Sequence, residues 1–360
     1  MNGTTSLNLS KAGEFEARVV SMLNEAALCL MTSLGHRSGL FDTMADLPPS
    51  TSKEIAEAAG LQERYVREWL AAMAVGGFVE QDPVKGTYTL PPEHTAILTR
   101  ASGSENAAVY SQYIPQLGSV EEDVLACFRN GGGVPYERFV RFHELMAEDS
   151  GLSVLPALRE WILPLVPGLI GQLETGIDVL DAGCGRGKAL NLMAEWFPNS
   201  RFTGYELSEE AVAFARAEAE AAGHSNVTFE ARDLTFFAEE APRERFDFVT
   251  TFDAVHDQGS PLGLLRGIRR ALKPGGAYLA QDIKGSSHVH LNRDHLFGPL
   301  LYTVSCMHCM PVSLAQGGEG LGTMWGREKA EDYFRKAGFR RIEVHELDHD
   351  PMNYYYVCRP

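Results

Sequence analysis

The sequence predicts an α/β protein in which a parallel sheet, covered by helices on both faces, follows a mainly helical winged-helix domain. Three observations support this prediction. Strand and helix patterns alternate from about residue 176 onward. A glycine-rich turn, 181–187, joins the first strand of that region to its helix. The first hundred residues show a different order, with helices followed by two short strands.

The N-terminal hundred residues have the element order of a winged helix. Apolar residues at helical spacing predict a long helix over 14–40. A short helix is expected over 53–59 and a longer one over 62–75, each ended by glycine. Two strands, 78–82 and 87–90, with a turn between them complete the pattern as a wing.

Three segments follow from these patterns. Residues 1–100 form the winged-helix domain, which we expect to mediate dimerisation. Residues 101–170 are predicted to be a mostly helical connector and lid, interrupted by glycine and proline. Residues 171–360 carry the sheet. Strands are expected at 178–181, 201–205, 227–231, 246–252, 277–282, 341–345 and 353–358, with helices at 187–196, 209–222, 262–272 and 327–337 and a turn at 272–276.

Composition narrows the class of protein. The 360 residues are 44% hydrophobic and 22% charged, which is typical of soluble globular proteins. The net charge of −16 argues against a nucleic-acid-binding surface and suits a cationic or neutral small ligand. We expect neither a signal peptide nor a membrane span, because no long apolar run is present. The six scattered cysteines suggest reduced thiols and a cytoplasmic protein.

The turn after the first strand of the sheet is a candidate ligand site. Asp181 is followed by glycines at 183, 185 and 187, and glycine lets the backbone approach a ligand closely. Lys188 stands where a dinucleotide-binding motif has its last glycine, and the P-loop pattern is absent. The loop alone could therefore serve several cofactors, but it fits neither of those two motifs.

Two acidic residues at the next strand ends make the loop more specific. Glu206 ends the second strand, 19 residues after Gly187, where a carboxylate can accept hydrogen bonds from ribose hydroxyls. Asp233 follows the third strand, where it could accept a hydrogen bond from an adenine amino group. Each acid alone could be a solvated loop residue. Successive strand ends line one crevice, however, so together they indicate a nucleoside site.

These residues resemble the motifs of class I S-adenosylmethionine-dependent methyltransferases over about residues 170–360. The resemblance implies a Rossmann-like, seven-stranded sheet whose last strand is antiparallel, with S-adenosyl-L-methionine as methyl donor. It places Asp181, Gly183 and Gly185 around the methionine portion, Glu206 at the ribose and Asp233 at the adenine. The expected cofactor-binding residues are Asp181, Gly183, Cys184, Gly185, Glu206, Leu207, Asp233, Leu234, Phe252 and Asp253.

The fourth strand leads into a second motif, His256-Asp257. Winged-helix, small-molecule O-methyltransferases carry His-Asp-Trp at this junction, and here Gln258 replaces the tryptophan. The resemblance implies that His256 is the general base that removes the acceptor proton, a role that suits the near-neutral pKa of histidine. The alternative is a structural histidine that caps the following helix or hydrogen-bonds Asp257.

A long insertion, 284–326, follows the fifth strand and contains several histidines and cysteines. Their spacing lacks the Cys-x₂-Cys and His-x₃-His frame of a zinc site, so we predict no metal and expect packing and pocket lining instead. The segment resembles one in a bacterial-type subgroup of winged-helix methyltransferases whose substrates are poorly defined. That resemblance names no acceptor atom.

Two alternatives to an enzyme remain, a winged-helix transcriptional regulator and a catalytically silent S-adenosylmethionine-binding protein. Residues 51–100 hold five basic and seven acidic residues, which disfavours DNA binding. We therefore predict a cytoplasmic homodimer that methylates a small molecule and has neither nucleic-acid nor membrane partners. The acceptor pocket is expected to draw on aromatic residues of the connector, Tyr110, Tyr113, Phe139 and Phe142.

Overall fold

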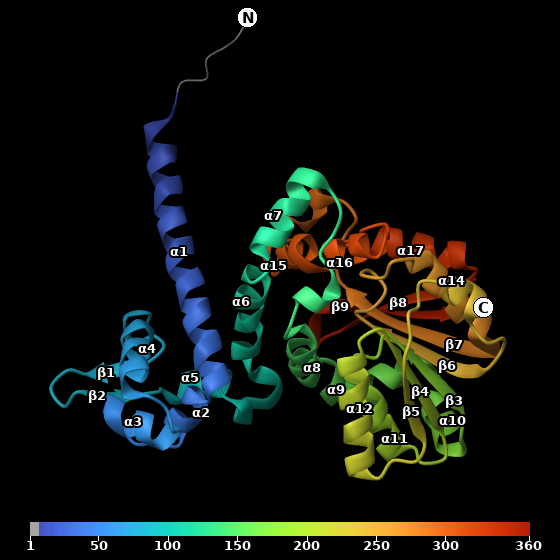
Figure 1. The fold of residues 1–360 in the computed structure, drawn as a ribbon, viewed down its shortest axis with the longest axis horizontal. Helices are drawn as coiled ribbons and strands as arrows, with labels where there is room; N and C mark the ends of the chain where they lie inside the picture. The colour runs from blue at the N-terminus through green and yellow to red at the C-terminus, as the bar shows by residue number, and fades with distance from the viewer. Residues whose placement is uncertain (1–6) are drawn as a thin grey trace, which may run out of the picture. The chain divides into compact units, whose positions relative to one another are not determined.

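The computed structural model describes residues 7–360 (Figure 1). The chain divides into two compact units, Met1–Gln116 and Leu117–Pro360. Within the described part of the chain, no single helix is both long and apolar enough to cross a membrane. One bent pair of segments, Phe142–Leu165 and Leu169–Thr175, has the required length and composition. These segments supply Leu158, Ile162 and Leu163 to the buried core of the second unit.

The first unit is a winged helix whose core is a cluster of apolar side chains that includes Phe41, Trp69 and Leu70. Helix α3 begins with a capping box, in which the side chains of Thr51 and Glu54 each accept a backbone N–H of the other. The elements are α1 (Leu9–Ser38), α2 (Leu40–Ala45), α3 (Ser52–Ala59), α4 (Glu63–Val75), the antiparallel strands β1 (Glu80–Asp82) and β2 (Thr87–Thr89), α5 (Pro92–Leu98), η1 (Arg100–Glu105) and η2 (Ala107–Gln112).

The bounds predicted for the long N-terminal helix, 14–40, are wrong at both ends. The helix begins earlier, at Leu9, because the Asn8 side chain caps it by accepting the backbone N–H of Lys11. It ends at Ser38, because Gly39 has a φ of 74°. That left-handed conformation stops α1, and α2 starts as a separate helix directly after it.

The second unit is built on a seven-stranded sheet with the order β5-β4-β3-β6-β7-β9-β8. Strands β3 to β7 are parallel, and β9 runs antiparallel to both of its neighbours, so the predicted seven-stranded sheet with an antiparallel last strand is confirmed. The strands are β3 (Asp178–Ala182), β4 (Arg201–Glu206), β5 (Val227–Ala231), β6 (Phe246–Phe252), β7 (Leu272–Ile283), β8 (Arg341–Leu347) and β9 (Asp350–Arg359).

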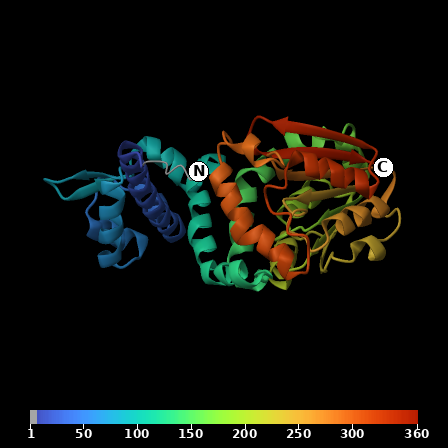
Figure 2. The same ribbon diagram turned by 90° about the horizontal axis from the view of Figure 1, so that it is seen from above.

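Helices cover both faces of this sheet (Figures 1 and 2). Alternate residues of a strand point to opposite faces, and Val179 and Leu180 accordingly belong to different apolar clusters. One cluster joins the sheet to α10, α11 and α12, and the other joins it to α14 and α17. The covering helices are α10 (Leu169–Thr175), α11 (Lys188–Trp196), α12 (Glu209–Ala222), α13 (Phe237–Glu240), α14 (Pro261–Ala271) and α17 (Gly326–Ala337).

Two segments differ from the regular βα pattern. The turn predicted at 272–276 is instead the start of β7, where the register with β6 jumps from Phe246–Leu272 to Phe248–Ala277. The residues between form a bulge inside the strand.

The connector and the insertion are mostly helical. They comprise α6 (Tyr113–Gly118), α7 (Glu121–Asn130), η3 (Tyr136–Arg138), α8 (Phe142–Leu152), α9 (Val154–Ala157), η4 (Leu158–Ile162), η5 (Leu163–Leu165), η6 (Val289–Asn292), α15 (Gly298–Val304), η7 (Ser305–Cys309) and α16 (Met310–Ala315).

Candidate functional site

The glycine-rich loop after β3 is held tightly against the end of β4. The backbone N–H groups of Gly183 and Cys184 both donate to the carbonyl oxygen of Tyr205, at 2.8 and 3.0 Å. Gly183 has a φ of 83°, and a Cβ atom there would lie 2.5 Å from the Cβ of Ala254. A Cβ at Gly185 would meet no atom within 4 Å, so this part of the loop is open. The loop therefore presents bare backbone to a ligand.

Glu206 sits beside this loop with its carboxylate already oriented. The N–H of Gly185 donates to Oε2 and the N–H of Ser208 donates to Oε1, both at 3.0 Å. A carboxylate has about four acceptor sites, so both oxygens can accept further hydrogen bonds. Asp233, after β5, is exposed, and its Oδ1 accepts the N–H of Thr235 at 2.8 Å.

One cavity in the second unit brings together all ten residues predicted to bind the cofactor. The connector adds Tyr136, Phe142, His143 and Met146 to the wall, and the insertion adds Val312. The ten predicted residues that line the cavity are Asp181, Gly183, Cys184, Gly185, Glu206, Leu207, Asp233, Leu234, Phe252 and Asp253.

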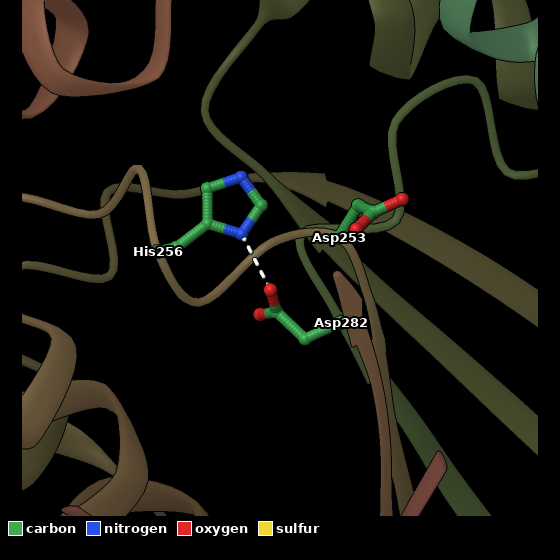
Figure 3. A group of neighbouring side chains, drawn as sticks. All are labelled: Asp253, His256 and Asp282. Atoms are coloured by element: carbon green, nitrogen blue, oxygen red, sulfur yellow. Dashed lines mark hydrogen bonds and ion pairs between the residues drawn. The ribbon is translucent and has the colours of Figure 1, made fainter. Parts of the chain in front are cut away.

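His256, the predicted base, lies behind the wall of this cavity. Its neighbours Asp257 and Gln258 line the cavity, whereas the side chain of His256 is buried and is not part of the lining. Its Nδ1 is 2.9 Å from Oδ1 of Asp282 at the end of β7 (Figure 3). The hydrogen bond of Nδ1 thus goes to Asp282, and not to Asp257 or to the helix that follows. Burial disfavours the charged ring, but Asp282 and Cys309 raise the pKa of His256 well above its usual value.

Two half-buried carboxyl groups of the cavity wall, those of Asp253 and Asp257, have raised pKa values. Burial raises the pKa of Asp257 to about 7, although the nearby His256 opposes the shift. Burial and then the charge of Asp282 raise the pKa of Asp253 to about 8. Asp253 also has a φ of 49°, a conformation that non-glycine residues rarely adopt outside functional sites. The cavity wall thus holds two carboxyl groups that keep a proton to higher pH than an ordinary aspartate.

The insertion forms part of the site wall through specific hydrogen bonds. The hydroxyl of Ser313 donates to the carbonyl oxygen of Gln258 at 2.8 Å, and Gln316 Nε2 donates to that of Asp257 at 3.4 Å. Trp325 Nε1 donates to Oδ1 of Asp282 at 2.9 Å. The insertion therefore fixes the segment that carries the His256-Asp257 motif.

His308 and Cys309 of the insertion contact each other, with Sγ of Cys309 3.5 Å from Nδ1 of His308. His308 is buried and stacks on Phe142, with ring centroids 3.5 Å apart, and Cys309 accepts the hydroxyl of Thr323. His295 contacts the carbonyl oxygen of Lys284. These contacts agree with the packing role predicted for the segment.

Sequence reasoning missed several residues of the site. Asp282 ends a predicted strand at the same edge of the sheet as Glu206, which is a signal that could have been used. Tyr136 and His143 carry no such signal, because their place in the wall depends on how the connector folds back. Of the aromatic residues proposed for the acceptor pocket, Phe142 lines the cavity and Phe139 packs behind it. Tyr110 and Tyr113 belong to the other unit.

Two family models match the chain. Residues 26–100 match the Rv2258c-like winged HTH domain, and residues 173–338 match a methyltransferase domain. The predicted combination of a winged-helix domain with a methyltransferase domain is therefore confirmed.

Curated relatives match over part of their length. The chain is 31% identical over 134 residues to a fatty-acid O-methyltransferase of Mycolicibacterium smegmatis, which covers 37% of this chain and 47% of the relative. It is 35% identical over 108 residues to a ubiquinone biosynthesis O-methyltransferase of Roseobacter denitrificans, or 30% of this chain and 42% of the relative. The chain thus spans less than half the length of these relatives.

Solved structures share the whole fold. The mitomycin 7-O-methyltransferase MmcR superposes with a TM-score of 0.69 at 17% identity, covering 98% of this chain and 100% of that one. Human N-acetylserotonin methyltransferase, solved with S-adenosylmethionine, has a TM-score of 0.64 at 17% identity and covers 99% of both chains. At these identities the likeness establishes the fold.

Asp181 makes the stability of the protein depend on pH. Burial raises its pKa to about 7, while the hydroxyl of Thr250 donates to Oδ1 and opposes the shift. The folded state therefore keeps a proton that the unfolded chain releases near pH 3.8. The stabilising contribution of this carboxyl is full below about pH 4, falls up to about pH 7 and stays low above that.

We expect Asp181→Asn to remove this dependence. The free energy of unfolding of the variant should exceed that of the wild type by an amount that grows between about pH 4 and about pH 7 and is constant above. Urea unfolding across that range measures the difference. A difference that does not vary with pH would show that Asp181 is not protonated in the folded protein.

Proposed function

We propose that this chain is an S-adenosylmethionine-dependent methyltransferase acting on a small-molecule acceptor. The observation that carries the proposal is the cavity in which the glycine loop, Glu206 and Asp233 come together on one methyltransferase domain. The O-methyltransferases that share the fold support a hydroxyl acceptor.

The residues of the cavity fit the donor in their chemistry. The bare backbone at Gly185 leaves room for the methionine portion, and the buried carboxyl of Asp181 lines the same cavity. Glu206 has acceptor capacity left for the two ribose hydroxyls. Asp233 lies at the next strand end, where it would accept from the adenine amino group.

When bound, S-adenosylmethionine supplies a methyl group on a sulfonium sulfur. The chain contributes mainly alignment, because an in-line displacement depends on how the acceptor is oriented. Tyr136, Phe142 and Val312 form an apolar part of the wall that would hold the acceptor and exclude water. Wall residues from the connector and the insertion thereby complete a site that the sheet begins.

Glu206→Gln should weaken the binding of S-adenosylhomocysteine, the product form of the donor. The neutral amide keeps the shape but loses charge-assisted acceptance of the ribose hydroxyls, so we expect the Kd to rise by roughly tenfold or more. Isothermal titration calorimetry measures the Kd. Glu220→Gln, at the far end of α12, is the matched control and should bind as the wild type does. Failure of the wild type to bind S-adenosylhomocysteine would overturn the proposed function.

We further propose that His256 serves the acceptor and has little part in binding the donor. It precedes Asp257 of the cavity wall and is hydrogen-bonded to Asp282, and unlike Gly185 and Glu206 it does not line the cavity. His256→Ala is expected to abolish turnover while it leaves the Kd for S-adenosylhomocysteine nearly unchanged. Transfer of radiolabelled methyl groups to deproteinised cell extract measures turnover, with His349→Ala as control. Retained turnover would remove His256 from the mechanism.

We propose that the winged helix does not read DNA. On α4, Arg64 pairs with Glu68 and Arg67 pairs with Glu63, each one helical turn apart. These pairs neutralise the basic side chains that a recognition helix would direct at phosphates.

We also propose that the protein is cytoplasmic, since all six cysteines are free and disulfides are rare in the cytoplasm.

We propose that the winged-helix domain forms a homodimer through α1. This 30-residue helix exposes apolar side chains along most of its length, and two pairs of them, Phe15 with Met22 and Leu23 with Leu30, are seven residues apart, the repeat of a helix-pairing seam. A second copy of the same helix would cover the seam. The exposed residues include Leu9, Phe15, Met22, Leu23, Leu30 and Leu34.

The double substitution Phe15→Glu and Leu23→Glu should convert the dimer to a monomer, because it places charges in the apolar seam. Multi-angle light scattering of the full chain gives the mass directly. Val84→Glu, on the exposed β1–β2 turn, is the control and should remain dimeric. A monomeric wild type, or a charged variant that stays dimeric, would show that α1 does not pair.

A further inference from the structure

Three polar side chains gather where β6 and β7 end. Asp253, His256 and Asp282 each offer a ligand atom, and these atoms lie within 4.8 Å of one another (Figure 3). Asp282 and His256 are 1% and 3% exposed. The imidazole and the Asp282 carboxyl group thus have almost no access to bulk water, whereas Asp253 is half-buried and faces the cavity. His256 pairs with Asp282, and Asp253 adds a second carboxyl group to the cluster that has no ion pair with a basic side chain among the described residues.

The hydrogen bonds around this cluster orient the carboxylates but leave one oxygen of each without a partner. Gln281 Nε2 donates to Asp253 Oδ2 at 3.1 Å, and Trp325 Nε1 donates to Asp282 Oδ1 at 2.9 Å. Asp253 Oδ1 and Asp282 Oδ2 are buried and have no hydrogen-bond partner among the described residues. Buried carboxylate oxygens rarely stay unpaired, so each of these two calls for a ligand.

One pair of ligand atoms in the cluster, which is hydrogen-bonded in this structure, also has the spacing of two ligands around an ion. Nδ1 of His256 and Oδ1 of Asp282 are 2.9 Å apart. Two ligand atoms at right angles around an ion, each with a bond of about 2.1 Å, would be separated by about 3.0 Å. Donors that orient each ligand from behind, as Gln281 and Trp325 do here, are a general feature of protein metal sites.

We propose that Asp253, His256 and Asp282 bind a divalent first-row transition-metal ion. One imidazole nitrogen with two carboxylates favours Mn²⁺ or Zn²⁺ over Mg²⁺ and Ca²⁺, which prefer oxygen ligands alone. The sequence did not indicate this site, because its ligands come from two strand ends and not from the cysteines and histidines of 284–326.

The proposed metal site lies beside the cavity, and this position indicates a role for the ion in activating the acceptor. Asp253 also lines the cavity, so an ion bound there has one side toward the acceptor. Such an ion would bind the acceptor oxygen and make its hydroxyl more acidic. This consequence rests on the proposed methyltransferase function, whereas binding of the ion does not. His256 would then serve the acceptor as a metal ligand.

Metal content of the full chain, freed of any affinity tag, tests the proposal. The protein is stripped with a chelator and then equilibrated by dialysis against Mn²⁺ or Zn²⁺, and bound metal is measured by mass spectrometry. We expect one ion per chain, with the Kd raised at least about tenfold in Asp253→Asn and in His256→Ala. His288→Gln with His290→Gln removes an exposed pair of histidines, where an adventitious ion would bind, and should leave the stoichiometry unchanged.

Circular dichroism establishes that each variant is folded, and Asp253→Asn, which keeps the side-chain shape, decides the matter if His256→Ala does not fold. The proposal is overturned if the wild type takes up no stoichiometric metal, if Asp253→Asn binds as the wild type does, or if only the His288/His290 variant loses the ion. S-adenosylhomocysteine binding to the stripped protein separates the two proposals. If it binds without metal uptake, this site alone is refuted, and if it fails to bind, the proposed function is refuted.

Discussion

The contact between the glycine loop and the end of β4 is the constraint on which the rest of the site depends. Two backbone N–H groups of the loop converge on the carbonyl of Tyr205, and a third, from Gly185, reaches Glu206. This close approach requires Gly204 in β4, because a Cβ there would lie 2.7 Å from the sulfur of Cys184. The same contact that closes the loop therefore turns the carboxylate of Glu206 toward the cavity, where the nucleoside is proposed to bind.

The acceptor side of the cavity has a different origin. The parallel strands provide one edge, but the opposite wall comes from the connector and the insertion, through residues such as Tyr136 and Val312. The insertion is bonded to the strand-end motif through Ser313 and Trp325, so its position and that of His256 are linked. Under the proposed function, the strand ends would hold the donor, while these two segments would define the acceptor.

The sequence predicted the strands of the sheet well, but apart from Phe142 it did not predict which residues of the connector and the insertion form the cavity wall. Strands β5 and β6 and helix α12 have the predicted bounds, because a buried strand or an amphipathic helix has a periodicity that its own residues carry. All ten predicted donor residues line the cavity, because parallel strand ends meet at one edge. Trp325 and Asp282 are 43 residues apart, however, and no pattern in the sequence around either residue predicts their hydrogen bond. The direction of the His256 side chain likewise depends on β7 and the insertion.

A crystal structure of the full chain with S-adenosylhomocysteine tests the central claim most directly. The account predicts both ribose hydroxyls within hydrogen-bond distance of the Glu206 carboxylate, the adenine beside Asp233, and the sulfur facing the wall formed by Tyr136, Phe142 and Asp257. A ligand bound elsewhere, or a ribose that does not contact Glu206, would contradict it.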